Sequence, residues 1–192
     1  MKVLVINGFG DFKITSPIAK EIYGGFAKGL LTNSLVDVAK QTFISKGYEV
    51  FETVVNNQYN IIEEQSKLHD CDIVFLQFPM YWYSIPSKLQ EYFENVYEFG
   101  EVTNENGEKY GDYGSLKGKK YILSTTMAAP ISSFNKGEFL SDFTIDSILA
   151  PIILTQKFVG FEVLPTILNT DVFEKDFNSM KENVINTINN NF

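Results

Sequence analysis

The alternation of short apolar runs with helical patterns constrains this sequence more than any other feature. Segments read as strands occupy residues 2–6, 48–55, 72–78, 120–126 and 161–168, of which 72–78 is a near-continuous apolar run. Patterns of helical spacing occupy residues 30–46, 59–68, 86–97, 144–158 and 173–188. Strands that alternate with helices predict an α/β protein with a parallel sheet covered on both faces. Right-handed crossovers then produce a doubly wound three-layer sandwich.

Local signals set the expected ends of several helices. Thr32, Asn33 and Ser34 are candidate caps for the helix that starts near residue 30, and Gly47 ends that helix. Pro151 must kink or divide the helix over 144–158, because a proline inside a helix removes a backbone hydrogen bond.

The carboxyl ends of parallel strands meet at one edge of such a sheet, and ligands bind there. This rule places three connecting segments on one rim, namely 7–29, 78–86 and 127–140. The first segment is rich in glycine and is predicted to be irregular. A second glycine-rich stretch, 99–118, is predicted to be a long loop, which in a compact domain is usually functional or disordered.

Composition and charge limit the kinds of ligand and partner that this protein is expected to bind. The formal net charge is −8, and the lysines are scattered, so no nucleic-acid partner is expected. Cys71 and His69 are the only residues of their kinds, which leaves no His/Cys metal cluster and no disulfide. No apolar segment reaches about 18 residues, and we expect a cytoplasmic protein without membrane insertion.

Two nucleotide-binding motifs fail when they are tested at the first rim segment. A dinucleotide fingerprint that begins at Gly8 and Gly10 requires a third glycine where Lys13 stands. A phosphate-binding loop of the triphosphatase type requires lysine and a hydroxyl where Leu30 and Leu31 stand. His69 lies near the amino end of the third strand, away from the ligand rim, and is read as structural.

The strongest functional signal is the aromatic segment Gln77-Phe78-Pro79-Met80-Tyr81-Trp82-Tyr83-Ser84-Ile85-Pro86. Its consecutive aromatics lie between a buried strand and a helix, so they cannot all enter the core. Two prolines stiffen the loop, and such a loop offers backbone amides and apolar walls to a flat ring such as isoalloxazine. Packing of the loop on its own helix or at a subunit contact is the alternative explanation.

At these residues the sequence resembles the flavodoxin-like NAD(P)H:quinone reductases, in particular the branch of the bacterial enzyme called modulator of drug activity B. The resemblance covers residues 1 to about 170. It is carried by the stretches 5–8, 77–82, 109–111, 116–126, 129–130 and 158–165. It implies a flavodoxin-like three-layer sandwich with a five-stranded parallel sheet in the order 2-1-3-4-5, and residues 1–192 form one domain.

The resemblance also implies FAD, with FMN as the alternative flavin, bound between the two subunits of a homodimer. The loop after the first strand and the start of its helix would hold the pyrophosphate, which suits a helix terminus with free amides. The third-strand loop would hold the flavin ring. The implied cofactor-binding residues are Ala27, Gly29, Leu31, Thr32, Ser34, Pro79, Met80, Tyr81, Trp82, Tyr110, Thr126, Met127, Ala128 and Ala129.

The sequence departs from the family pattern in three places. Ala27 stands where the family usually has serine, which removes one phosphate hydrogen bond. Met127 and Ala128 stand where Trp-Asn is common, which removes a stacking wall and a polar side chain. The loop over residues 9–26 is longer than the family norm.

The expected activity is a two-electron reduction. NADPH or NADH would reduce the flavin, and a quinone-like acceptor would then be reduced by it, with no obligatory side-chain acid or base. Two alternatives stay open. One is a flavin electron carrier of the flavodoxin type, and the other is a flavin-free regulatory protein on the same fold.

Overall fold

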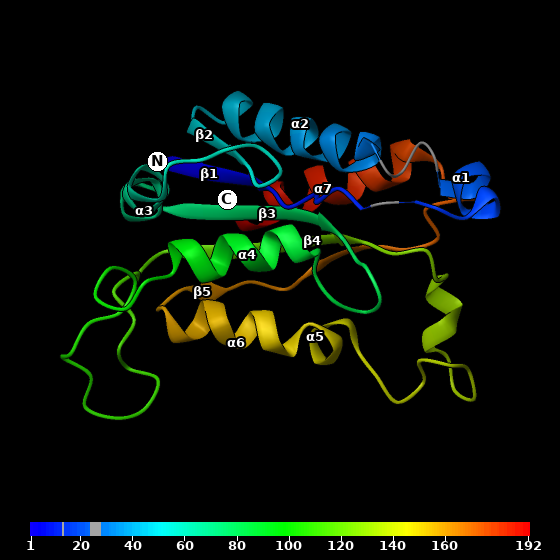
Figure 1. Ribbon diagram of the computed structural model, residues 1–192. Helices are drawn as coiled ribbons and strands as arrows, with labels where there is room; N and C mark the ends of the chain where they lie inside the picture. Colours follow the sequence, from blue (N-terminus) through cyan, green and yellow to red (C-terminus); the bar gives the residue numbers. More distant parts are fainter. Residues whose placement is uncertain (13, 24–27) are drawn as a thin grey trace.

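Two layers of helices enclose a parallel sheet in the computed structural model, which describes residues 1–12, 14–23 and 28–192, with Tyr23 described by its backbone alone (Figure 1). The strands are β1 (Lys2–Asn7), β2 (Glu49–Val54), β3 (Ile73–Pro79), β4 (Lys120–Thr126), β5 (Glu162–Val163) and β6 (Ile167–Asn169). The helices are α1 (Pro17–Tyr23), α2 (Leu30–Ser45), α3 (Ile61–Asp70), α4 (Ser87–Val96), the 3-10 helix η2 (Ile131–Phe134), α5 (Ile145–Ile148), α6 (Ala150–Phe158) and α7 (Phe177–Asn191).

The strand order is β2-β1-β3-β4-β5, and every pair of neighbouring strands is parallel. This confirms the predicted flavodoxin-like order 2-1-3-4-5. One detail differs, because the fifth strand is divided. β5 and β6 both pair with β4, and the register shifts by one residue between Tyr121↔Val163 and Ser124↔Ile167. Pro165 lies in the gap, where the one-residue shift in register ends the regular pairing.

Alternate residues of each strand feed two separate cores. Val3 and Val5 of β1 face α2 and α7, whereas Leu4 and Ile6 face α3, α4 and α6. Both sets are fully buried. This is the two-sided burial that the near-continuous apolar runs predict, since successive strand side chains point to opposite faces.

The helix ends follow local signals, some of which the sequence analysis missed. Helices α5 and α6 meet at Leu149, with Pro151 in the first turn of α6, which confirms the predicted division. Helix α1 corrects the prediction of an irregular 8–29 segment. Its signal is Ser16-Pro17, because the Ser16 hydroxyl accepts a hydrogen bond from the amide of Ala19 and proline suits the first helical position.

The carboxyl ends of the strands gather at the right-hand edge of Figure 1, together with α1 and the start of α2. The 99–118 loop lies at the opposite edge, where the strands begin (Figure 1). Within the described ranges, no helix is both long and apolar enough to cross a bilayer.

Candidate flavin site at the carboxyl ends of the strands

The end of β1 is tied to the start of α2 by side-chain amides. The Asn7 side chain is buried, and its Nδ2 donates to Oδ1 of Asn33 over 2.7 Å. Its own Oδ1 accepts from the backbone amide of Phe9 over 3.2 Å. These bonds hold the strand exit and the first turn of α2 in one arrangement.

The N-terminus of α2 has no capping side chain. Its N-cap is Gly29 at φ 67, and a Cβ there would lie 2.7 Å from Cδ1 of Phe9. The prediction of Thr32, Asn33 and Ser34 as caps is therefore wrong. A left-handed N-cap packed on an aromatic ring requires glycine, which has no side-chain oxygen. The first-turn amides and the positive end of the helix dipole are thus available to an anion.

The other predicted residues of this segment have different surroundings. Thr32 is buried and Leu31 is half-buried in the second core. Ser34 is exposed, and its hydroxyl donates to the carbonyl of Leu30 over 2.9 Å. Ala27 lies outside the described residues.

The aromatic segment after β3 forms a tight reverse turn. Tyr81 and Ser84 exchange two backbone hydrogen bonds of 2.9 and 3.0 Å. Between them, Trp82 and Tyr83 adopt φ values of 52 and 60, which is the left-handed region. Bulky residues rarely occupy this region, and strained backbone of this kind gathers at ligand sites. The Trp82 side chain is 96% exposed.

The exits of β3, β4 and β6 are joined by backbone hydrogen bonds. The Met80 amide donates to the carbonyl of Thr126 over 2.8 Å, and the Met127 amide donates to the carbonyl of Asn169 over 2.9 Å. Met127 points inward and is buried, whereas Ala128 is exposed and Ala129 is half-buried. The structure thus brings Pro79 to Trp82 and Thr126 to Ala129 together.

Tyr81 connects this turn with the loop after β1. Its ring packs edge-on against Phe12, with the centroids 5.0 Å apart. Burial, followed by the nearby Asp11 carboxylate, raises the pKa of the Tyr81 phenol well above its usual value. The Tyr81 hydroxyl is buried without a partner among the described residues, as are Oγ1 of Thr125 and Nδ2 of Asn169. Unpaired buried polar atoms at a ligand rim are candidates to bind a ligand.

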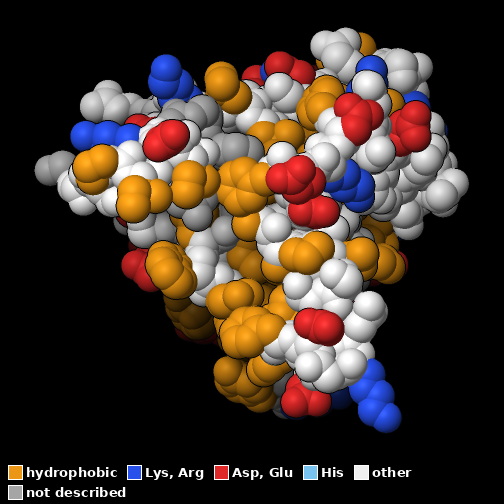
Figure 2. Space-filling model, turned by 90° about the vertical axis from the view of Figure 1, so that its right-hand side faces the viewer, with side chains coloured by type: hydrophobic (Ala, Val, Ile, Leu, Met, Phe, Trp, Pro, Cys, Tyr) orange, Lys and Arg blue, Asp and Glu red, His pale blue; other side chains and the backbone are white. Residues whose placement is uncertain are grey.

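The rim itself is strongly apolar. Figure 2 shows hydrophobic side chains gathered over the face that carries the strand ends. Exposed large hydrophobic residues on the rim segments are Phe12, Ile18, Ile22, Trp82, Tyr83, Ile131 and Phe139. An exposed apolar surface of this kind indicates a binding face.

Tyr110 does not join this group within one chain. It belongs to the 99–118 loop at the opposite edge of the sheet (Figure 1). Its side chain is 87% exposed, and its ring lies 5.5 Å from that of Phe158 at the end of α6. A contact between Tyr110 and a ligand at the carboxyl rim therefore requires a second copy of the chain.

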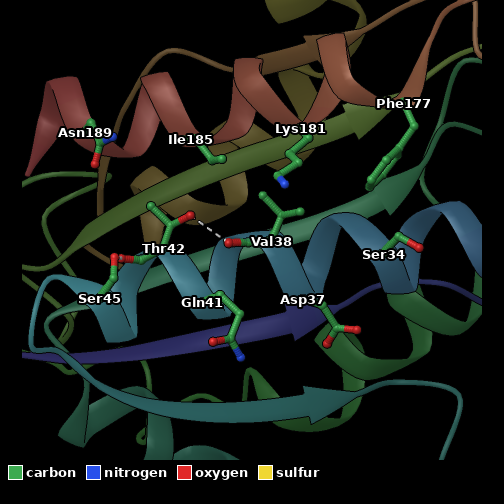
Figure 3. Close-up of a pocket in the computed structure, with 10 residues that line it drawn as sticks. All are labelled: Ser34, Asp37, Val38, Gln41, Thr42, Ser45, Phe177, Lys181, Ile185 and Asn189. Carbon is green, nitrogen blue, oxygen red and sulfur yellow. Dashed lines mark hydrogen bonds between the residues drawn. The ribbon is translucent and has the colours of Figure 1, made fainter.

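Two grooves on the described surface lie outside the aromatic turn and the 126–129 segment. One, of ≈ 560 Å³, runs between α2 and α7 and includes Ser34, Asp37 and Lys181 in its lining (Figure 3). The other lies on α3 beside His69, whose Nε2 is 3.1 Å from the carbonyl oxygen of Glu101. The described residues contain no group of three or more His, Cys, Asp or Glu placed to hold a metal ion.

Sequence reasoning missed three features of the rim. These are the Asn7–Asn33 bond, the unpaired amide of Asn169 and a ring contact between Tyr83 and Phe139. Asn7 could have been found from its place at a strand exit. The unpaired Asn169 amide and the Tyr83–Phe139 contact depend on the side-chain conformations of loop residues, which no local sequence pattern predicts.

The fold and this rim define an α/β protein with the architecture of flavin-binding domains. A family model described as "Flavodoxin-like fold" matches residues 1–188, and the chain belongs to this family. The chain is 32% identical over 158 residues to the NADPH:quinone oxidoreductase MdaB of Haemophilus influenzae, covering 77% of this chain and 82% of that protein. It is 29% identical to an uncharacterised protein of Schizosaccharomyces pombe, covering 91% of this chain and 88% of that protein.

Solved structures share the architecture at lower identity. A Klebsiella pneumoniae protein superposes with a TM-score of 0.77 at 21% identity, covering all of this chain (100%) and 85% of that chain. The general stress protein 14 of Treponema denticola, solved in complex with FMN, has a TM-score of 0.69 at 16% identity and covers 98% and 97% of the two chains. At these identities the likeness establishes the fold.

Proposed function

We propose that this protein is an NAD(P)H-dependent flavoprotein reductase that passes two electrons through a bound flavin to quinone-like acceptors. The observation that carries the proposal is the strained aromatic turn after β3, which stands beside the uncapped terminus of α2 on one apolar rim. The named relative MdaB, an NADPH:quinone oxidoreductase, supports the same activity.

The residues present suit a flavin. The first-turn amides of α2 suit a phosphate, and the stiff segment from Pro79 to Trp82 suits the edge of a flat ring. The unpaired Tyr81 hydroxyl and the Asn169 amide are polar groups that a ligand could satisfy. A bound flavin supplies hydride acceptance from the nicotinamide and two-electron delivery to a quinone.

The chain's own contribution is binding, orientation and exclusion of water. The Met80–Thr126 bond fixes the ring-binding loop to β4, and the Asn7–Asn33 bond fixes the phosphate-binding turn to β1. The balanced reaction is NAD(P)H plus a proton plus a quinone, which gives NAD(P)⁺ and a quinol. No side chain needs to act as an acid or base, because the quinol oxygens can take protons from water.

The finer parts of the proposal rest on the family resemblance. FAD is the proposed flavin and FMN the alternative, since the Treponema relative was solved with FMN. NADPH or NADH is the reductant. We propose a cytoplasmic homodimer of single-domain chains with the flavin at the subunit interface, where Tyr110 of a second copy would reach the rim.

The test is to purify the protein, record its visible absorbance, release the cofactor and identify it by chromatography. NADPH and NADH oxidation is then followed with menadione as acceptor. We expect a yellow protein that oxidises at least one nucleotide in a menadione-dependent way. A flavin-loaded protein that oxidises neither nucleotide would contradict the reductase proposal and favour an electron carrier. A protein that takes up neither FAD nor FMN would favour a flavin-free regulatory role.

A further inference from the structure

The dipeptide Asn106-Gly107 lies on an exposed part of the 99–118 loop. Asn106 is exposed, and neither residue belongs to a helix or a strand. In the part of the chain that the structure describes, the Asn106 side-chain amide has no hydrogen-bond partner, and the backbone N–H of Gly107 has none either. The side chain is therefore free to turn toward the backbone nitrogen that follows it.

The packing of Gly107 explains why this position holds glycine. A Cβ there would lie 2.6 Å from Cδ1 of Tyr113, so a larger residue would displace the ring. The backbone around it is anchored, because the Asn104 amide donates to the carbonyl of Tyr113 over 2.7 Å and Oδ1 of Asn104 accepts from the Asn106 amide over 2.9 Å. The structure thus places an unhindered residue directly after an exposed asparagine.

An asparagine in this setting can lose its side-chain amide without an enzyme, because glycine has no Cβ to hinder the attack. The Gly107 nitrogen forms a bond to Cγ of Asn106, the bond from Cγ to Nδ2 breaks, and ammonia leaves with the proton of the Gly107 amide. Water then opens the five-membered succinimide. Cleavage of the new bond at Cγ leaves aspartate, and cleavage at the backbone carbonyl carbon leaves isoaspartate. Neither step oxidises or reduces any atom.

The chain contains one other Asn-Gly pair, Asn7-Gly8, and its surroundings are the opposite. Asn7 ends β1 and is 4% exposed. Its Nδ2 donates to Asn33 and its Oδ1 accepts from Phe9, while the Gly8 amide donates to the carbonyl of Gln77 over 2.8 Å. Because the side chain and the attacking nitrogen are both held in place, the reaction there requires local unfolding.

We propose that Asn106 is a site of spontaneous deamidation and isoaspartate formation in the folded protein, and that Asn7 is protected from the same reaction. The change adds one negative charge between Glu105 and Glu108. Isoaspartate also lengthens the main chain by one methylene group, four residues before Tyr110. Its free carboxylate is the group that protein-isoaspartate methyltransferases esterify, so an enzyme of this repair class is the expected partner. The inference is independent of the bound flavin.

The test is to age the purified protein at neutral pH and physiological temperature. Isoaspartate is measured by methyl transfer from S-adenosylmethionine with a purified isoaspartate methyltransferase, and the modified peptides are assigned by mass spectrometry. Asn106→Gln removes the site, since glutamine would have to close a less favourable six-membered ring. Asn57→Gln is the matched control, because Asn57 is exposed and is followed by Gln58. A parallel sample aged in urea frees both Asn-Gly pairs from the fold.

We expect Asn106 to be converted at least about tenfold faster than Asn7 in the folded protein, and the two rates to agree within about twofold in urea. Asn106→Gln should remove most of the methyl acceptance of the aged protein, and Asn57→Gln should leave it unchanged. Equal rates for the two pairs in the folded protein would overturn the proposal. So would an Asn106 that reacts only in urea, since the folded loop would then keep its side chain away from Gly107.

Discussion

The turn at Trp82 and Tyr83 holds two bulky residues in a backbone conformation that costs about 1–2 kcal/mol for each. Trp82 contributes little packing in return, because its side chain lies almost wholly in solvent. The strain is kept by the paired hydrogen bonds between Tyr81 and Ser84 and by the anchored ends of the loop. Because the strained Trp82 adds little packing, we infer that it serves binding and not folding.

Trp82→Gly should therefore raise the free energy of unfolding, by about 1 kcal/mol, because glycine adopts positive φ without strain. The same change should lower the flavin content of the purified protein. Urea unfolding and visible absorbance measure the two effects. Phe99→Gly is the control, since Phe99 is 71% exposed in the 99–118 loop and lacks a positive φ. A Trp82→Gly protein less stable than the original would show that the turn is unstrained.

Cys71 is buried, and its thiol is therefore less acidic than that of an exposed cysteine. Burial raises the pKa of its thiol from 9.0 to about 11, with a smaller opposing effect from Lys119. The folded state thus holds the thiol proton more tightly than the unfolded state. Its contribution to stability is complete below pH 9 and is lost as the pH rises toward 11.

Unfolding free energies measured from pH 8 to pH 11 should fall, with Cys71 contributing about 2 kcal/mol of the loss. Cys71→Ala should flatten part of this decline. The remainder should persist, because burial also raises the pKa of Tyr92 and Tyr121. In the native protein iodoacetamide should leave Cys71 unmodified, and rapid alkylation at neutral pH would contradict the assigned burial.

At the scale of elements, one buried carboxylate joins β2, α3 and α4. Glu64 accepts hydrogen bonds from the Thr53 hydroxyl over 2.6 Å and the Tyr92 hydroxyl over 3.0 Å. Its other oxygen receives Nζ of Lys67 over 2.6 Å. If this side chain is removed, the two hydroxyls lose their acceptor, whereas Nζ of Lys67 keeps the Glu52 carbonyl over 3.3 Å and Oγ1 of Thr53 over 3.2 Å.

Glu64→Ala should reduce the free energy of unfolding by about 3 kcal/mol, because it leaves two buried hydroxyls without their acceptor and removes the counter-charge of the half-buried Lys67. Glu63→Ala, at the exposed neighbouring position in the same first turn, should cost at most about 0.5 kcal/mol. Equilibrium denaturation of both variants gives the comparison. Equal losses would mean that the Glu64 bonds contribute no more than the helix dipole does.

Helices and strands could be predicted where a strand is buried on both faces of the sheet or where a proline marks the end of a helix. β3 is a nearly continuous apolar run, and Pro151 divides its helix as expected. The split of the last strand was missed because the apolar pattern continues through the one-residue shift in register at residues 164–166. Helix α1 was missed because glycines on either side masked the Ser16-Pro17 signal.

The candidate site was predictable in position and less so in detail. Topology alone places Pro79–Trp82 and Thr126–Ala129 on one rim, and they lie there. The left-handed turn at Trp82 runs against local preference, so only the surrounding hydrogen bonds specify it. The separation of Tyr110 from the rim depends on the path of a long loop, which periodicity does not encode.

At the scale of the whole molecule, the aromatic turn and Tyr110 occupy opposite edges of the sheet. If both contact one flavin, they come from different chains. Trp82→Ala and Tyr110→Ala proteins, each inactive alone, should then complement each other after joint unfolding and refolding. Random pairing should restore about a quarter of wild-type activity, because each mixed dimer holds one intact site. The separately refolded variants are the controls. If the mixture recovers no activity, Trp82 and Tyr110 of different chains do not contact the same flavin.

The parallel pairing of β1 has a consequence for how the chain is made. β1 is an inner strand, and it pairs with residues 49–54 on one side and 73–77 on the other, both of which are translated after it. Its backbone groups have no sheet partner until those residues emerge. During synthesis, the apolar residues 3–6 of β1 therefore wait for about seventy residues of translation, and nascent-chain chaperones are expected to engage them there.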